Sequence, residues 1–145
     1  MFEHVHLPEA DPSYNMPYTP AIKIMGGAIV FCAGVTAAPV YHSHPHVAAE
    51  FEAIPDDPAD QTERAFDNLE RVLEAAGCEL AGVVDLTRFI VDAERNQDAI
   101  NRVAARRLGS HRPASTTVEV VRLATDPRLV LELRAVAFVS GTPSH

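Results

Sequence analysis

The stretch that decides the fold runs from Asp57 to Val91 and reads DPADQTERAFDNLERVLEAAGCELAGVVDLTRFIV. Asp57 followed by Pro58 is a typical helix start, because aspartate caps the first backbone amides and proline fits the first helical position. Gly77 predicts the helix end, and apolar residues recur at helical spacing before it: Phe66, Leu69, Val72, Leu73 and Ala76. The apolar, β-branched run from Val83 to Val91 predicts a buried strand. A helix followed directly by a strand indicates a mixed domain of helices and strands.

The same alternation continues on both sides of this stretch. Upstream, short apolar segments at residues 21–25 and 28–34 predict two strands joined by a turn at Gly26-Gly27. Downstream we expect one helix and two strands (about 95–108, 115–123 and 129–139). The element order is therefore ββαβαββ. It predicts an α+β fold in which two helices pack on one face of a single sheet.

Two segments fall outside this periodicity. Residues 1–20 contain four prolines, so we expect an extended N-terminal arm there. Residues 37–57 contain three prolines and three histidines and predict a long ordered loop, which in a compact domain is often functional. The length of 145 residues fits a single domain over residues 1–145.

Composition excludes several classes of function. The chain has 12 Lys+Arg against 20 Asp+Glu, a formal net charge of -8, which argues against binding to a nucleic-acid backbone. No stretch approaches the roughly 20 apolar residues of a membrane span. Cys32 and Cys78 lie far apart and make neither a disulfide framework nor a zinc ligand set. We therefore expect an acidic, soluble, cytoplasmic protein.

The last predicted strand carries apolar residues on both faces. Alternation places Leu131, Leu133, Ala135 and Ala137 on one side, and Val136 and Phe138 on the other. Two helices can cover only one face of the sheet, so the second face must be buried elsewhere. Association of identical chains in closed symmetry is the simplest way to bury it.

Five segments taken together resemble the reactive-intermediate deaminase (Rid, also called YjgF) family. They are PYTPAI (17–22), IVFCAGV (29–35), QTERAFDNLERVLEAAG (61–77), VVDLTRFIVD (83–92), and RPASTTVEVVRL with LVLELRAVAF (112–123 and 129–138). The resemblance covers about residues 17–139. It implies a chorismate-mutase-like fold and a homotrimer whose active clefts lie between subunits. It also implies hydrolysis of a small enamine or imine, with release of ammonia and no cofactor.

The resemblance assigns candidate residues to this site. Glu132 stands at the family's acid/base glutamate, Tyr18 at the aromatic position of the N-terminal arm, and Gly34 at the end of a strand that lines the cleft. The family's carboxylate clamp is the arginine of a P-A-R motif, but here the triplet is Pro113-Ala114-Ser115. A serine hydroxyl cannot give a bidentate, charged grip on a carboxylate. We therefore expect a substrate other than 2-aminoacrylate.

Other polar residues near the vacated clamp are candidates for substrate binding. Ser115 and Thr117 share a strand face and can donate hydrogen bonds, although both are also ordinary strand residues. Arg112 precedes Pro113 and can reach toward the clamp position, or it is simply an exposed loop arginine. Arg88 lies in mid-strand among apolar residues, where a charge needs a partner. The favoured interpretation is a structural ion pair, for which a carboxylate across a subunit boundary is one candidate partner.

His42, His44 and His46 alternate, so in an extended chain all three point the same way. One interpretation is that protonated imidazole replaces the missing arginine, with His44 catalytic and His42 and His46 binding substrate. A second is a zinc or iron site, for which no fourth ligand is evident in the sequence. A third is hydrogen bonding to the backbone of the loop. We take the first as the working hypothesis and expect no metal and no organic cofactor.

Two classes of function remain open. Glu132 in a cleft between subunits favours an enzyme, unless Arg134 on the same strand face neutralises it. Loss of the clamp arginine favours a non-catalytic trimer that binds a small metabolite or a protein.

Overall fold

The computed structural model describes residues 1–14 and 21–141. Its strands and helices, in chain order, are β1 (Phe2–Val5), β2 (Ala21–Ile24), β3 (Ala28–Phe31), α1 (Pro58–Ala75), β4 (Val83–Val91), α2 (Ala93–Leu108), β5 (Ala114–Val120) and β6 (Leu131–Val139). Short 3-10 turns occur at Pro12–Tyr14, Ala48–Phe51 and Leu80–Gly82.

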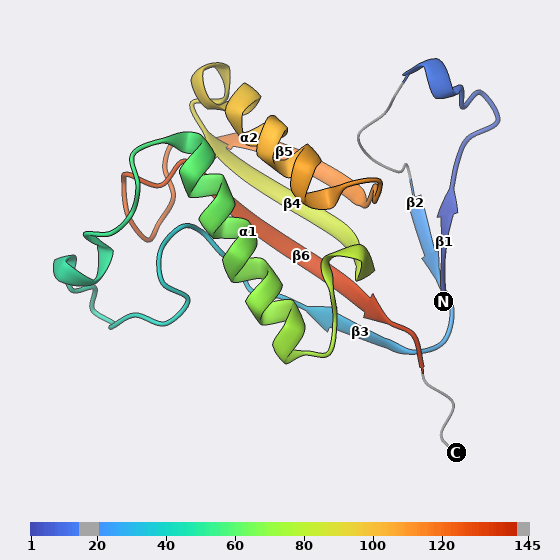
Figure 1. Cartoon of the computed structure of the whole chain (residues 1–145), viewed down its shortest axis with the longest axis horizontal. Coiled ribbons are helices and arrows are strands. Elements are labelled where there is room, and N and C mark those ends of the chain that lie inside the picture. The colour runs from blue at the N-terminus through green and yellow to red at the C-terminus, as the bar shows by residue number, and fades with distance from the viewer. Residues whose placement is uncertain (15–20, 142–145) are drawn as a thin grey trace.

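The main sheet has four strands in the order β3-β6-β4-β5. β4 and β5 are parallel and are connected through α2, whereas β6 is antiparallel to both β3 and β4. Both helices lie on the same side of this sheet (Figure 1). The predicted α+β arrangement, with two helices on one face, is confirmed.

The core lies between α1 and the central strands. α1 begins where the sequence predicts, because the side chain of Asp57 accepts a hydrogen bond from the backbone N–H of Asp60 and Pro58 opens the helix. The helix buries Phe66, Leu69 and Leu73 against alternate residues of β6, namely Leu131, Leu133, Ala135 and Ala137. The apolar residues at helical spacing on α1 and the alternate residues of β6 therefore form one apolar layer.

Gln61, in the first turn of α1, joins the helix to two other segments. Its Nε2 donates hydrogen bonds to the carbonyl oxygens of Pro55 (2.9 Å) and Arg128 (2.8 Å), and its Oε1 accepts one from the N–H of Val130 (2.9 Å). The side chain is almost completely buried, so all three bonds are shielded from water. The end of the 37–57 loop and the turn before β6 are thus fixed to the same side chain.

The N-terminal region differs from the prediction of a wholly extended arm and one sheet. β1 pairs antiparallel with β2, with Phe2 opposite Ile24, and this two-stranded ribbon is separate from the main sheet. The expected hairpin between residues 21–25 and 28–34 is therefore wrong: Gly26 and Gly27, both at positive φ, turn the chain between two sheets. The ribbon packs against the main sheet through Phe2, because the centroid of its ring lies 6.2 Å from that of Phe138 on β6.

The strand ends also differ from the predictions in three places. The strand expected at 28–34 stops at Phe31, and the one expected at 115–123 stops at Val120, after which Val121 is 98% exposed. β6 starts at Leu131 rather than at 129, because Leu129 is buried in the preceding turn. Cys32 is buried, and burial raises the pKa of its thiol, as expected for a core cysteine.

The second face of the main sheet is not covered by helices. The register places Phe31 beside Val136, and Ile29 beside Phe138, on the side of β6 that faces away from the core. Phe31 is 71% exposed and Ile29 is 49% exposed. We call the side of the sheet that faces away from the helices the open face. Every helix in the described part of the chain is too short or too polar to cross a membrane.

Candidate functional site

Glu132 lies on the open face, where β6 pairs with β4 and Glu132 is opposite Phe89. Its carboxylate lies over Gly34: a Cβ added at Gly34 would stand only 2.6 Å from Oε1 of Glu132. A side chain at position 34 would therefore force the Glu132 carboxylate to move. The structure brings together two of the residues that the sequence assigned to the site.

The environment of Glu132 suits a proton acceptor. Burial raises the pKa of its carboxyl group above the ordinary value, because the charged form is partly removed from water. Among the described residues no ion pair joins Glu132 to Arg134, so the alternative in which that arginine neutralises it has no support within one chain. A carboxylate with a raised pKa and no cation beside it is a stronger base than an exposed one.

Ser115 and Thr117 lie on the other side of the sheet. In the parallel pairing of β4 and β5, Ser115 is opposite Leu86 and Thr117 is opposite Arg88. Leu86 is 2% exposed and belongs to the core beneath the helices, so this row of residues faces the helix side. The structure confirms that the two hydroxyl residues share a face and shows that this face is not the one that carries Glu132.

Arg88 on β4 lies near Ser115, the position at which the family has its clamp arginine. Ser115 is opposite Leu86, and Arg88 follows Leu86 two residues later on the same face of the sheet. Its Nε donates a hydrogen bond to Oγ1 of Thr117 (3.0 Å), and its Nη1 donates one to Oδ1 of Asn101 on α2 (2.9 Å). We call Arg88, Asn101 and Thr117 the Arg88 cluster. Burial lowers the pKa of Arg88, and no carboxylate pairs with it among the described residues. Within residues 1–14 and 21–141 its acceptors are two neutral side chains, and an ion pair across a subunit boundary stays a prediction.

Arg112 has a different environment. It lies between α2 and β5, and its Nη1 donates hydrogen bonds to the carbonyl oxygens of Gly109 (2.6 Å) and His111 (3.1 Å). These bonds hold the side chain against the end of α2. Tyr18, the remaining arm residue of the predicted site, lies outside the described residues.

The three loop histidines form one cluster. The ring centroids of His42 and His44 are 4.7 Å apart, those of His42 and His46 5.0 Å, and those of His44 and His46 5.3 Å. Phe51 lies beside two of these rings, at 5.1 Å from His42 and 5.2 Å from His46. Among the described residues, no ring contact or hydrogen bond connects the three histidines to Glu132. The hypothesis that a loop histidine acts together with Glu132 concerns a cleft between subunits and stays a prediction.

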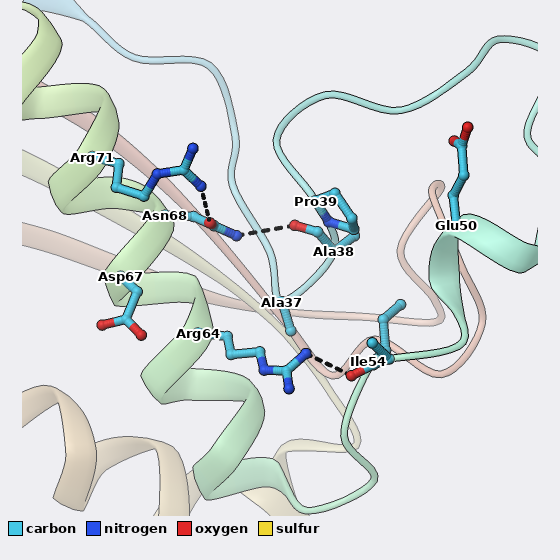
Figure 2. Close-up of a pocket in the computed structure, with 10 residues that line it drawn as sticks. Ala37, Ala38, Pro39, Glu50, Ile54, Arg64, Asp67, Asn68 and Arg71 are labelled. Carbon is cyan, nitrogen blue, oxygen red and sulfur yellow. Dashed lines mark hydrogen bonds between the residues drawn. The ribbon is translucent and has the colours of Figure 1, made fainter.

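A pocket of about 280 Å³ lies between the 37–57 loop and α1 (Figure 2). On its helix side are Arg64, Asn68 and Arg71, which follow one another at helical spacing. Asn68 Nδ2 donates hydrogen bonds to the carbonyl oxygens of Thr36 (2.8 Å) and Ala38 (3.0 Å), and so fixes the start of the loop. We did not predict this pocket; the only signal was the polar spacing on α1. Neither Glu132 nor any of the three histidines lines it.

The topology, with a helix-covered core and an apolar open face, defines a class of small α+β subunits. Comparison with known proteins identifies the family. Residues 9–139 match the family model described as Endoribonuclease L-PSP. A RutC family protein of Pyrococcus abyssi is 32% identical over 138 residues, which cover 95% of this chain and 98% of that protein. The chain therefore belongs to the Endoribonuclease L-PSP family, the YjgF/Rid family of the resemblance.

Solved structures agree with this assignment. Rv2704 of Mycobacterium tuberculosis, a YjgF/YER057c/UK114 family member, is 29% identical with a TM-score of 0.62, covering 96% of this chain and 100% of that chain. TdcF of E. coli, solved with bound serine, is 26% identical with a TM-score of 0.64, covering 86% and 90% respectively. The predicted chorismate-mutase-like fold class is confirmed.

Proposed function

We propose that this protein hydrolyses an unstable enamine or imine metabolite and that Glu132 is its proton acceptor. The observation that carries the proposal is the carboxylate of Glu132, partly buried over Gly34, with a raised pKa and no paired cation among the described residues. Membership in the YjgF/Rid family supports the same reaction class.

The chemistry requires only water and a group that moves protons. Glu132 takes a proton from water as the water oxygen bonds to the iminium carbon, which gives a carbinolamine. The proton then passes from Glu132 to the nitrogen, and the C–N bond breaks with its electron pair leaving on ammonia. The hydroxyl group returns its own proton to Glu132 as a lone pair of its oxygen forms the new carbonyl bond. The products are ammonia and a keto compound, and no electron acceptor is needed.

The proposed assembly is a homotrimer. Ile29, Phe31 and Val118 are each more than 40% exposed, and the register places all three on the open face. Apolar side chains gathered on one face of a sheet favour burial against another copy. Glu132 and the Arg88 cluster lie on opposite faces of one sheet, so they cannot meet within one chain. In a trimer, Glu132 of one copy can lie beside the Arg88 cluster of another copy.

We place the anionic part of the substrate at the Arg88 cluster. Arg88 is opposite Thr117 in the β4–β5 register, two positions along from the pair formed by Leu86 and Ser115. Its Nη2 has no hydrogen-bond acceptor among the described residues, so a planar guanidinium donor remains for a carboxylate. TdcF, which was solved with bound serine, indicates that a relative accepts an amino-acid-sized ligand. Because the cation sits on β4 instead of β5, the preferred substrate is expected to differ from 2-aminoacrylate.

The alternative is a binding module of the same fold that has lost the chemistry. Serine at position 115 favours it, because the family's clamp is absent at that position. The net charge of -8 makes RNA, which the family description names, a poor match for this chain.

The test is ammonia release from imines generated in situ from a panel of amino acids. Glu132→Gln is expected to lower the rate about 10²- to 10⁴-fold, the usual range for general acid–base catalysis. Arg88→Gln is expected to raise KM for carboxylate substrates, while Arg102→Gln, at an exposed arginine of α2, serves as the matched control. Ser115→Arg is expected to raise the weak activity on 2-aminoacrylate.

Three results would contradict the proposal. Tight binding of a metabolite without turnover of any imine would support the binding module. Cleavage of RNA that is lost in Glu132→Gln would support a nuclease. Full activity of Glu132→Gln would show that another group handles the proton.

A further inference from the structure

The histidine cluster of the 37–57 loop has the geometry of a metal site. His42, His44 and His46 each offer one ring nitrogen, and these three nitrogens lie within 4.8 Å of one another. Tetrahedral zinc, with Zn–N bonds of about 2.0–2.1 Å, places its ligand nitrogens about 3.3 Å apart. Any two of these nitrogens must therefore approach each other by no more than about 1.5 Å to reach that spacing.

One of the histidines has an unsatisfied polar atom. Nδ1 of His42 is buried and has no hydrogen-bond partner among the described residues. A buried polar nitrogen normally finds a partner, because leaving it without one costs the free energy of its lost hydration. A metal ion bound between the rings would supply that partner for the imidazole lone pair.

The cluster rests on a rigid apolar support. Phe51, which contacts the rings of His42 and His46, is 2% exposed. It belongs to a second core cluster that also contains Ala37, Ala38, Ile54, Leu123 and Leu129. A ligand set backed by packed side chains loses less conformational entropy on binding than one on a loose loop.

Electrostatics at the cluster favour a cation. Glu50 lies close enough to His42 and His44 for their charges to interact with its carboxylate. Its two oxygens accept hydrogen bonds from the N–H (2.7 Å) and the hydroxyl (2.6 Å) of Ser43, which hold the carboxylate in place. A carboxylate close to two of the three imidazoles favours binding of a divalent ion.

We propose that His42, His44 and His46 bind one Zn²⁺ ion per chain and leave its fourth position for water or an external ligand. Three imidazole ligands are among the sets that zinc accepts in proteins, and imidazole suits it better than it suits Mg²⁺ or Ca²⁺. This replaces the expectation of no metal and does not depend on the role of Glu132.

The experiment uses the full chain without a polyhistidine tag, stripped of metal with a chelator that is then removed. Titration with ZnCl₂ in a calorimeter is expected to give one site per chain, with a Kd of about 1 µM or tighter, that is, at least about 8 kcal/mol of binding free energy. Co²⁺ at the same site is expected to give the visible absorption of a four- or five-coordinate centre. Lowering the pH should weaken binding, because each imidazole must lose its proton to bind.

Variants assign the site to the three histidines. His42→Ala and His46→Ala are each expected to weaken zinc binding by at least about 100-fold, since losing only an outer partner of a ligand already costs 10- to 100-fold. His6→Ala, at an exposed histidine of the N-terminal region, is the matched control and should bind like the wild type. Thermal unfolding without zinc checks that each variant folds, and His46→Gln replaces any variant that does not.

The proposal is overturned if the stripped wild type takes up no zinc. It is overturned equally if the Kd is weaker than about 1 µM, or if His42→Ala and His46→Ala, or His46→Gln in place of one that does not fold, bind zinc as the wild type does. Loss of zinc binding in His6→Ala would place the metal elsewhere.

Discussion

The two faces of the main sheet have opposite relations to water. On the covered face Leu131 and Leu133 are no more than 1% exposed, since α1 packs over them. On the open face of the same sheet Phe31 is 71% exposed. Folding of one chain therefore buries the first face, whereas the second keeps apolar area that a single chain cannot bury.

This difference teaches that stability and assembly depend on different residues of the same strands. β6 contributes to both, because alternate side chains point to opposite sides. A change at Leu131 or Leu133, on the covered face of β6, tests the fold of one chain. A change on the open face tests the contact between chains. Three predictions follow this division.

The largest effect is expected on the covered face. Leu133→Ala removes a completely buried side chain and leaves a cavity, so it should lower the free energy of unfolding by about 2–5 kcal/mol. Urea unfolding measures the loss. Leu7→Ala, at a leucine that is 55% exposed, is the control and should change the free energy by less than about 0.5 kcal/mol. Equal effects at both positions would remove the distinction between buried and exposed leucines.

A change on the open face should affect assembly more than folding. Phe31→Asp places a charge in the proposed contact between copies, so the mass from light scattering should fall from about three times 15.7 kDa toward one chain. Far-UV circular dichroism should remain that of the folded chain. Val121→Asp, beyond the end of β5, is the control and should remain a trimer. A Phe31→Asp trimer, or a wild type that is already monomeric, would contradict the proposed use of the open face. Phe138 is a poorer choice, because Phe2 covers it within the chain and it is only 5% exposed.

The smallest effect concerns the charge on the open face. The pKa of Glu132 is raised above 4.5, so the folded chain binds this proton more tightly than the unfolded chain does, and ionisation of Glu132 costs stability. The cost is absent below about pH 4.5 and grows as the pH rises through the raised pKa. Glu132→Gln should therefore increase the free energy of unfolding at pH 7 by a small amount, because the carboxyl group is only partly buried.

Urea midpoints measured from pH 3.5 to 8 test this dependence on Glu132. The gain from Glu132→Gln should disappear at the acidic end, while Glu79→Gln, at an exposed glutamate, gives no such pattern. A gain that is the same at every pH would show that its cause is not the ionisation of Glu132.

The sequence predicted α1 and β4 well, because the signals for these two elements lie within the elements themselves or directly beside them. Asp57, Pro58 and the apolar spacing after them give the start of α1, and the β-branched run gives β4 at Val83–Val91 without error. β1 was missed because its partner β2 lies about twenty residues away, and pairing of Phe2 with Ile24 leaves no pattern within either segment. The early end of β5 follows from its pairing, because its partner β4 ends at Val91, opposite Val120, although Val121 has the β propensity of its neighbours.

The site was predictable only in part. Glu132 and Gly34 were found through the family resemblance, and the structure places them in contact. The sequence indicated that Arg88 needs a partner but not which residue it is. The partner Asn101 lies on α2, and which side of α2 faces Arg88 depends on how the helix packs on the sheet. That Ser115 faces away from Glu132 follows from the register of three strands, which a single sequence does not specify.

The bonds made by Gln61 have a consequence for loop engineering. They hold Pro55 at the end of the 37–57 loop, while Asn68 holds Thr36 and Ala38 at its beginning, so both ends of the loop are attached to α1. Residues can then be inserted or removed between these anchors at an entropic cost of only about 0.6 kcal/mol for a doubling in length. Because Gln61 also holds Val130, two residues before Glu132, the position of the carboxylate does not depend on how long the loop is. Added residues are therefore expected to be tolerated at the exposed segment around Tyr41, whereas Phe51 and Ile54 belong to the second core cluster and must stay in place.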